Sequence, residues 1–167
     1  AFLIDGKIIN SVNVPSVDPD KLLQLNPYME LATKLGKVLC QMVEGPLSSV
    51  EIGIFGEASK FDSHPIASAS MVGLLCRHHA VPVNQINALH LARRQGINVT
   101  KVSSADSKDY LSLVRITARS SEQTVILEGA IFDESRPRLV KINGYEIESP
   151  LEGHLLITKH ADEAMKG

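Results

Sequence analysis

Basic side chains in the second half of this sequence are the residues best suited to chemistry. Arginines, lysines and two serines recur there, at Arg93, Arg94, Lys101, Ser103, Ser104, Lys108, Arg115, Arg136, Arg138 and Lys141. Such groups bind a phosphate or a carboxylate when two or more of them converge, whereas a single exposed cation contributes little in water. The sequence therefore predicts a weak, salt-sensitive site for a small anion. Alternatively, each cation taken singly lies on a solvated surface or interacts with the negative end of a helix.

The segment RPRLVK, residues 136–141, offers the best supply of donors for that site. It alternates cations with apolar residues, as expected for a strand. Because successive strand residues point to opposite faces, Arg138 and Lys141 should point in opposite directions, and only one of them can line a given pocket. We favour Arg138, and we expect Lys101 or Arg115, on neighbouring strands, to supply the second donor.

Other kinds of site lack their usual sequence patterns. The Gly-rich turn G-x-G-x-x-G that brings backbone N–H groups to a dinucleotide is absent, and so is the turn motif around a catalytic serine. His78 and His79 are adjacent and diverge on a helix, and the other histidines have no Cys or carboxylate at metal-ligand spacing. We therefore expect no catalytic residue, no bound cofactor and no metal in this chain.

The two cysteines, Cys40 and Cys76, stand far apart in segments with helical patterns. Unpaired cysteine often behaves as a small buried hydrophobic residue. We expect that role for both residues, in preference to a disulfide or a redox-active pair.

Length and composition limit the chain to one domain, or to one domain and the edge of another. It has 167 residues, 44% of them hydrophobic, and a formal net charge of -2. This balance gives no electrostatic signature for nucleic acid or an anionic membrane surface, so neither is expected as a partner. The apolar runs are too short to span a bilayer. The opening AFLI is followed by Asp5 and lacks the order of a secretory signal, and we expect cytoplasmic localisation.

Helical periodicity dominates the first part of the chain. Asp18–Pro19 and Asn26–Pro27 are each typical of a helix start, which predicts a short helix followed by a longer one. The longer helix should end before Gly45. Its apolar face comprises Tyr28, Leu31, Leu35, Val38 and Met42.

Between residues 49 and 96 the expected order is strand, loop, helix and helix. Residues 49–55 alternate as a half-buried strand, and a helix should begin near Ser63. The last helix, NQINALHLARR, starts at residue 84 and stops at Gly96. Within it, Asn87 is flanked by apolar residues and must be hydrogen-bonded if it is buried, so we expect it to pair with a neighbouring loop.

After Gly96 the apolar period changes from helical to two. Strands are expected within residues 97–104, 109–120, 123–134, 137–142, 145–148 and 153–160. Asn143–Gly144 is a strong signal for a two-residue hairpin. The pattern predicts an α+β fold, with helices packed on one face of a largely antiparallel sheet.

Three segments are more specific than this general pattern. They are INALHLARRQGI (residues 86–97), KINGYEIESPLEG (141–153) and NSVNVP (10–15). In their order they resemble the region downstream of the nucleotide-binding domain in long forms of D-3-phosphoglycerate dehydrogenase. The resemblance covers nearly the whole chain, which begins without Met and which we expect to be a piece of a longer protein. It implies a tail at 1–15, the allosteric substrate-binding (intervening) domain at 16–150, and the first strand of a truncated ACT domain at 151–167.

The resemblance implies a regulatory role. In this family the whole enzyme oxidises 3-phosphoglycerate with NAD to start serine biosynthesis, as a homo-oligomer that responds to serine at the ACT domain. The intervening domain binds an anionic, substrate-like effector. The chain would then be a non-catalytic allosteric module whose partner is phosphate or a 3-phosphoglycerate-like anion, with NAD used only by the parent enzyme. Two alternatives stay open: the related domain of an iron–sulfur L-serine dehydratase, and a purely structural or oligomerisation spacer.

Overall fold

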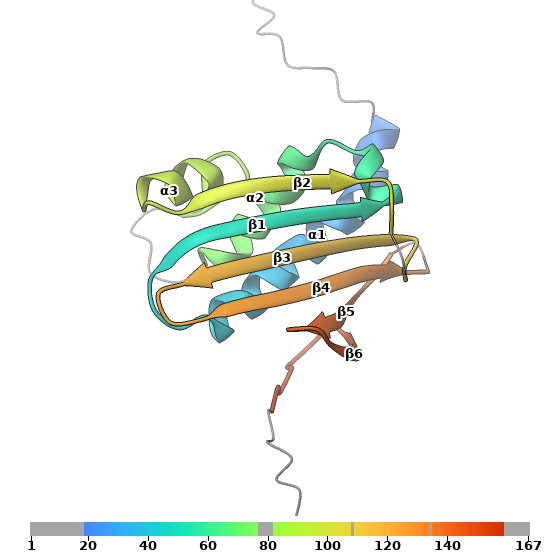
Figure 1. The fold of residues 1–167 in the computed structure, drawn as a ribbon. Coiled ribbons are helices and arrows are strands. Elements are labelled where there is room, and N and C mark those ends of the chain that lie inside the picture. The colour runs from blue at the N-terminus through green and yellow to red at the C-terminus, as the bar shows by residue number, and fades with distance from the viewer. Residues whose placement is uncertain (1–18, 77–81, 108, 134, 159–167) are drawn as a thin grey trace, which may run out of the picture.

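The computed structural model describes residues 19–76, 82–107, 109–133 and 135–158. Within these ranges the chain forms a six-stranded sheet with the strand order β2-β1-β3-β4-β5-β6. Helices α1 and α2 lie behind this sheet in Figure 1, and the face turned toward the viewer carries no described helix. The elements are α1 (Pro19–Met42), β1 (Leu47–Gly56), η1 (Glu57–Lys60), α2 (Ser63–Leu74), α3 (Ala88–Arg94), β2 (Asn98–Ser104), β3 (Ser112–Ser120), β4 (Thr124–Phe132), β5 (Arg136–Ile142) and β6 (Tyr145–Pro150).

The predicted α+β class is confirmed, with one parallel pair of strands in the sheet. β1 pairs in parallel with β2 and antiparallel with β3, and the later neighbouring pairs are all antiparallel. The parallel pair arises because the chain leaves β1, passes through α2 and α3, and returns to add β2 at the outer edge (Figure 1). Buried residues of all three helices join one core with the sheet, so the helices lie on one side of it, as predicted.

Helix α1 is continuous, so the prediction of two helices that meet at Asn26–Pro27 is wrong. Pro27 lies inside it and, because it lacks an N–H, cannot donate the usual helical hydrogen bond. Leu25 before the proline and Leu31 after it are both buried in the same core. Burial on both sides of Pro27 favours a continuous helix, since tertiary packing outweighs local propensity.

The apolar face predicted for this helix packs against the sheet. Leu31 and Leu35 are fully buried, and the rest of the predicted stripe is partly buried against the same core: Tyr28, Val38 and Met42. The inward-facing residues of β1 are fully buried, as predicted: Val50, Ile52 and Ile54. Gly129 on β4 makes room for α1, because a methyl group there would come within 2.6 Å of a Leu31 methyl carbon.

Helices α1 and α2 touch backbone to backbone at two glycines. A methyl group on Gly36 would collide with the Ser70 carbonyl oxygen, and one on Gly73 would collide with the Thr33 carbonyl oxygen. Only hydrogen fits at either position, because the helices approach too closely for a side chain between them. These glycines therefore fix the separation of the two helices.

Cys40 and Cys76 lie just beyond this glycine contact, and the prediction that both are buried is wrong. Cys76 is exposed and Cys40 is half-buried. Their Sγ atoms lie 3.4 Å apart. The contact between α1 and α2 thus brings together two residues that the sequence pattern leaves far apart.

The start of α2 is set by a side-chain hydrogen bond. Helix α2 begins at Ser63, as predicted, and the preceding Asp62 carboxylate accepts a hydrogen bond from the His64 backbone N–H at 3.0 Å. The segment before α2, predicted as a loop, contains the short 3-10 helix η1.

Helix α3 begins at Ala88 instead of residue 84, because two asparagines shape the turn before it. Asn84 Oδ1 accepts a hydrogen bond from the Asn87 backbone N–H at 3.0 Å, and Asn87 Nδ2 donates to the Pro82 carbonyl oxygen at 2.9 Å. The predicted pairing of Asn87 with a neighbouring loop is therefore confirmed. Gly96 follows the helix with a φ of 77°, a conformation that favours glycine.

Residues 154–158 form no strand, contrary to the strand predicted at 153–160. A strand needs a partner backbone, and this segment pairs with no strand of the described chain. Leu156 is 88% exposed, so the described residues do not bury this apolar run. The predicted tail at 1–15, the cap at Asp18 and the end of the predicted strand lie outside the described residues, and the domain boundaries stay predictions.

Replacing Gly73 with alanine should lower the free energy of unfolding by about 1 to 3 kcal/mol, because the added methyl group forces α1 and α2 apart. Alanine otherwise stabilises a helix relative to glycine by up to about 1 kcal/mol, so the sign of the change is informative. Urea denaturation followed by circular dichroism measures it. Gln41→Ala, at an exposed position of α1, is the control and should change stability by less than about 0.5 kcal/mol. A Gly73→Ala variant as stable as the wild type would contradict the close contact.

Candidate functional site

A β-bulge in β5 places two of the predicted donors on the same face of the sheet. Arg138 lies opposite Ala130 on β4 and Lys141 lies opposite Glu128, with a register shift between these pairs. Ala130 and Glu128 are two residues apart and share a face, so Arg138 and Lys141 share it too. The prediction that the two cations point to opposite faces is wrong, because Val140 is the extra residue of the bulge and resets the alternation.

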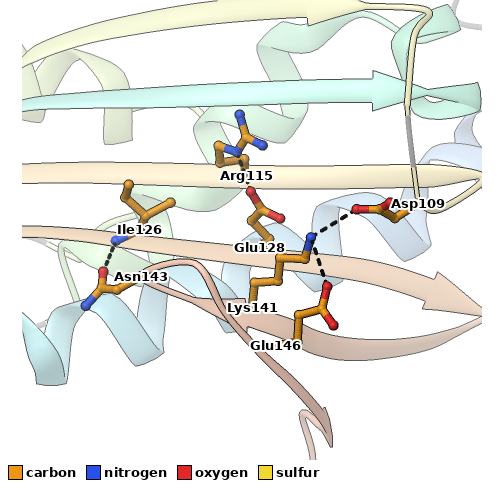
Figure 2. A network of polar contacts seen from close by, with 7 residues as sticks. All are labelled: Asp109, Arg115, Ile126, Glu128, Lys141, Asn143 and Glu146. Atoms are coloured by element: carbon orange, nitrogen blue, oxygen red, sulfur yellow. Dashed lines mark hydrogen bonds and ion pairs between the residues drawn. The ribbon is translucent and has the colours of Figure 1, made fainter.

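This shared face is the open face, defined as the face of the sheet that no described helix covers (Figure 1). Arg115 and Lys141 belong to one row across three of its strands, with Glu128 between them (Figure 2). Arg115 Nε donates to Glu128 Oε1 at 2.6 Å, and its guanidinium carbon lies 5.1 Å from the centroid of the Phe55 ring. Glu128 is only 7% exposed, so its charge needs this partner.

Lys141 is held by two carboxylates from different segments (Figure 2). Its Nζ donates to Asp109 Oδ2 at 3.0 Å and lies 3.5 Å from Glu146 Oε1. The hydrogen bond to Asp109 raises the pKa of the Lys141 ammonium above its ordinary value, and the charges of Asp109, Glu128 and Glu146 also raise it. Lys141 thus joins β5 to β6 and to the loop that precedes β3.

Arg138 makes a similar connection between β5 and β6. Its Nη1 donates to Glu148 Oε1 at 2.6 Å. Its guanidinium carbon lies 5.3 Å from the centroid of the Phe132 ring. A carboxylate on one side and an aromatic ring on the other therefore hold the planar group in place.

Lys101 lies on the other side of the sheet. It is opposite Ile52 in the parallel pair of β1 and β2, and Ile52 is buried under the helices. Side chains directly opposite each other in neighbouring strands point to the same face. Lys101 therefore does not converge with Arg138, while Arg115 shares the open face with Arg138 but is separated from it by β4.

An apolar floor lies among the cations of the open face. Its buried members are Leu113, Ala130 and Val140, with Phe55, Tyr110 and Phe132 packed around them. Such a floor keeps water away from part of each charged group and strengthens the hydrogen bonds made above it.

The predicted hairpin at Asn143–Gly144 is confirmed, and Asn143 has a second role. The two residues have φ values of 49° and 85°, as a tight turn between antiparallel strands requires. Asn143 Oδ1 accepts from the Ile126 N–H at 2.8 Å (Figure 2), and the Asn143 N–H donates to the Ile126 carbonyl oxygen at 2.8 Å. The hairpin is therefore anchored to β4, which fixes the position of β5 and its cations.

The carboxylates of the open face are functional candidates that the sequence interpretation missed. They form three ion-pair groups, called here the open-face ion pairs: Arg115–Glu128, Arg138–Glu148, and Lys141 with Asp109 and Glu146. The available signals were an acid inside the apolar strand VILEGAIF and two acids that alternate in YEIE. An incoming anion would have to compete with these carboxylates.

Other kinds of site find no support in the described part of the chain. Its residues contain no group of three or more His, Cys, Asp or Glu that could hold a metal ion. Among its helices, none has the length and apolar character needed to cross a membrane.

A family model and several known proteins are similar to this chain. Residues 24–143 match the family described as the D-3-phosphoglycerate dehydrogenase intervening domain. Proteins named D-3-phosphoglycerate dehydrogenase from Methanocaldococcus jannaschii, Synechocystis sp. and Bacillus subtilis are 35%, 27% and 25% identical to the chain. The matched segments cover 92%, 92% and 93% of this chain. They cover 29%, 28% and 30% of the relatives, so the chain spans less than a third of their length.

The ion pairs of Lys141 should make stability depend on pH in the alkaline range. A raised pKa in the folded state means that the stabilisation is complete below the unfolded pKa of about 10.4 and is lost as the pH rises through the folded value. The stability difference between wild type and Lys141→Met should therefore be constant from about pH 7 to 9 and shrink at higher pH. Urea denaturation at each pH measures it. Lys101→Met is the control, and an equal pH dependence in both variants would contradict the assignment.

Proposed function

The chain belongs to the family of D-3-phosphoglycerate dehydrogenase intervening domains, and we propose that it is the non-catalytic, regulatory part of such an enzyme. In the whole protein, a dinucleotide-binding domain outside this chain would use NAD to oxidise 3-phosphoglycerate. The enzyme would be a cytoplasmic homo-oligomer, and residues 151–167 would lead into an ACT domain. The names of the relatives support a dehydrogenase as the parent and give no support to a serine dehydratase.

The observation that best supports a regulatory role is the gathering of Arg115, Arg138 and Lys141 on one open face. Arg138 and Lys141 lie opposite positions two residues apart on β4, a spacing of roughly 7 Å along the strand. That spacing suits a ligand with a phosphate at one end and a carboxylate at the other. We therefore propose 3-phosphoglycerate or a close analogue as the effector.

The resident carboxylates determine where such a ligand would bind. The side chains of Glu148 and Glu146 are 58% and 81% exposed, so each can turn into water when an anion takes its place. The side chain of Glu128 is 10% exposed and has no such freedom. We place the ligand at Arg138 and Lys141 and give Arg115 a supporting role. Because each new contact replaces an existing ion pair, binding should be weak.

The open-face ion pairs also favour a second candidate, a structural spacer. Each of the three cations Arg115, Arg138 and Lys141 already has a carboxylate partner, so the positive charges are neutralised without a ligand. In that case the pairs would serve only to hold β3, β4, β5 and β6 in register.

Calorimetric titration at low salt distinguishes the two functions. The wild-type chain should bind 3-phosphoglycerate more tightly than inorganic phosphate, because only the former has two anionic ends. Arg138→Ala should weaken binding about tenfold or more, since it removes a charged hydrogen-bond donor. Glu148→Gln should tighten binding by about two- to fivefold, since it removes a competing exposed carboxylate.

Lys101→Ala is the matched control for these titrations, because it removes one cation from the opposite side of the sheet. Its affinity should equal that of the wild type. Equal affinity in Arg138→Ala would exclude Arg138 from the site. Failure of the wild-type chain to bind any of these anions would favour the spacer.

The isolated chain should produce no NADH from 3-phosphoglycerate and NAD, because it has no Gly-rich dinucleotide turn. Absorbance of NADH measures the reaction, with the full-length relative from Bacillus subtilis as the positive control. A rate above the buffer blank that follows the concentration of the chain would overturn the non-catalytic assignment.

A further inference from the structure

Two thiols lie in contact where α1 and α2 pack together. The Sγ atoms of Cys40 and Cys76 are 3.4 Å apart, although the residues are 36 positions apart in the chain. A disulfide has a sulfur–sulfur distance of about 2.05 Å, so the two sulfurs need to approach by about 1.4 Å. Small rotations of both side chains can supply a movement of this size.

The backbone holds the two thiols near each other. Cys40 lies four residues after Gly36 on α1, and Cys76 lies three residues after Gly73 on α2. The glycines keep the two helix backbones in direct contact. Cys40 lies one helical turn beyond Gly36, and Cys76 follows directly after the end of α2, so both thiols stay beside the contact between the two helices whenever the helices are packed.

The two thiols differ in exposure. Cys76 is exposed and follows the end of α2, whereas Cys40 is half-buried. Cys40 also lines a pocket of about 420 Å³ together with Val43, Leu74 and Ile97. A soluble reagent can therefore reach the Cys76 thiol first, and the Cys40 thiol lies close enough to react with it next.

We propose that Cys40 and Cys76 are a redox modification site, at which a small-molecule disulfide oxidises the pair to an intramolecular disulfide. The Cys76 thiolate attacks one sulfur of the small disulfide, which forms a mixed disulfide and releases one small thiol. The Cys40 thiolate then attacks Cys76 Sγ, which forms the internal bond and releases the second small thiol. Two electrons pass from the cysteines to the small disulfide, and the two cysteine protons end on the released thiols.

The internal disulfide would cross-link α1 to the end of α2. It would close a loop from Cys40 to Cys76, 36 positions apart, that contains the whole of β1. Cross-linking a loop of this length removes conformational freedom from the unfolded chain. The same chain would thus exist in a reduced form and in a more stable oxidised form. The change would act on the helical layer and not on the open face.

Incubation of the folded chain with glutathione disulfide tests the proposal. The wild type should lose both thiol groups and two hydrogens in mass, with no attached glutathione. Its melting temperature should rise on the order of 5 to 10 °C, and a reducing agent should reverse all three changes. Intact-mass spectrometry, thiol titration and a thermal melt measure them.

Single-thiol variants provide the matched controls. Cys40→Ser should stop at the mixed disulfide on Cys76, with no rise in melting temperature. The wild type unfolded in urea should acquire glutathione adducts, because the thiols are then no longer held together. Two glutathione adducts on the folded wild type, or disulfide-linked dimers in place of the internal bond, would overturn the proposal.

A bridging reagent gives a readout that needs no oxidation. A monosubstituted trivalent arsenical binds stably only to two adjacent thiols, so the folded wild type should bind one and either serine variant should bind none. Equal binding by the wild type and the Cys76→Ser variant would show that the two thiols do not act as a pair.

Discussion

The rest of the structure depends on how closely α1 approaches both the sheet and α2. On one side its leucines, Leu31 and Leu35, are fully buried against the strands, each contributing about 2 kcal/mol by transfer from water. On the other side Gly36 meets the backbone of α2, and Gly73 of α2 meets the backbone of α1. Every described helix lies on this side, so other interactions have to stabilise the opposite face of the sheet in the described part of the chain.

Charged pairs provide that stabilisation. The open-face ion pairs connect β3 with β4, β5 with β6, and β5 with the loop before β3, over a floor of buried apolar and partly buried aromatic side chains. Alternating charges on an uncovered sheet face also discourage stacking against other apolar surfaces. The same side chains can therefore hold the sheet and present donors to a ligand, which is why a regulatory site and a structural role are close alternatives here.

Periodic features were predictable because periodicity reports which face of an element is buried. The apolar stripe of α1, the alternation in β1 and the Asn143–Gly144 hairpin all follow from local patterns. The bulge at Val140 does not, since two adjacent apolar residues fit either a slipped strand or one buried on both faces. Once Val140 is counted as an extra residue, Arg138 and Lys141 point to the same face instead of opposite faces. Lys141 then joins Arg138 in the site, whereas the predicted site included only one of them. The thiol pair and the unbroken α1 are consequences of tertiary packing, which no local pattern contains.

The link between Arg138 and Glu148 has a mechanical consequence. Glu148 belongs to β6, the strand from which the chain leaves the sheet toward residue 158. A ligand that took the place of Glu148 would remove one of the cross-links between β6 and β5. By thermodynamic reciprocity, a load that pulls β6 away from β5 would strengthen binding of the ligand by the same factor by which the ligand loosens the strand. The edge of this sheet would then convert tension at the end of the domain into affinity at its face.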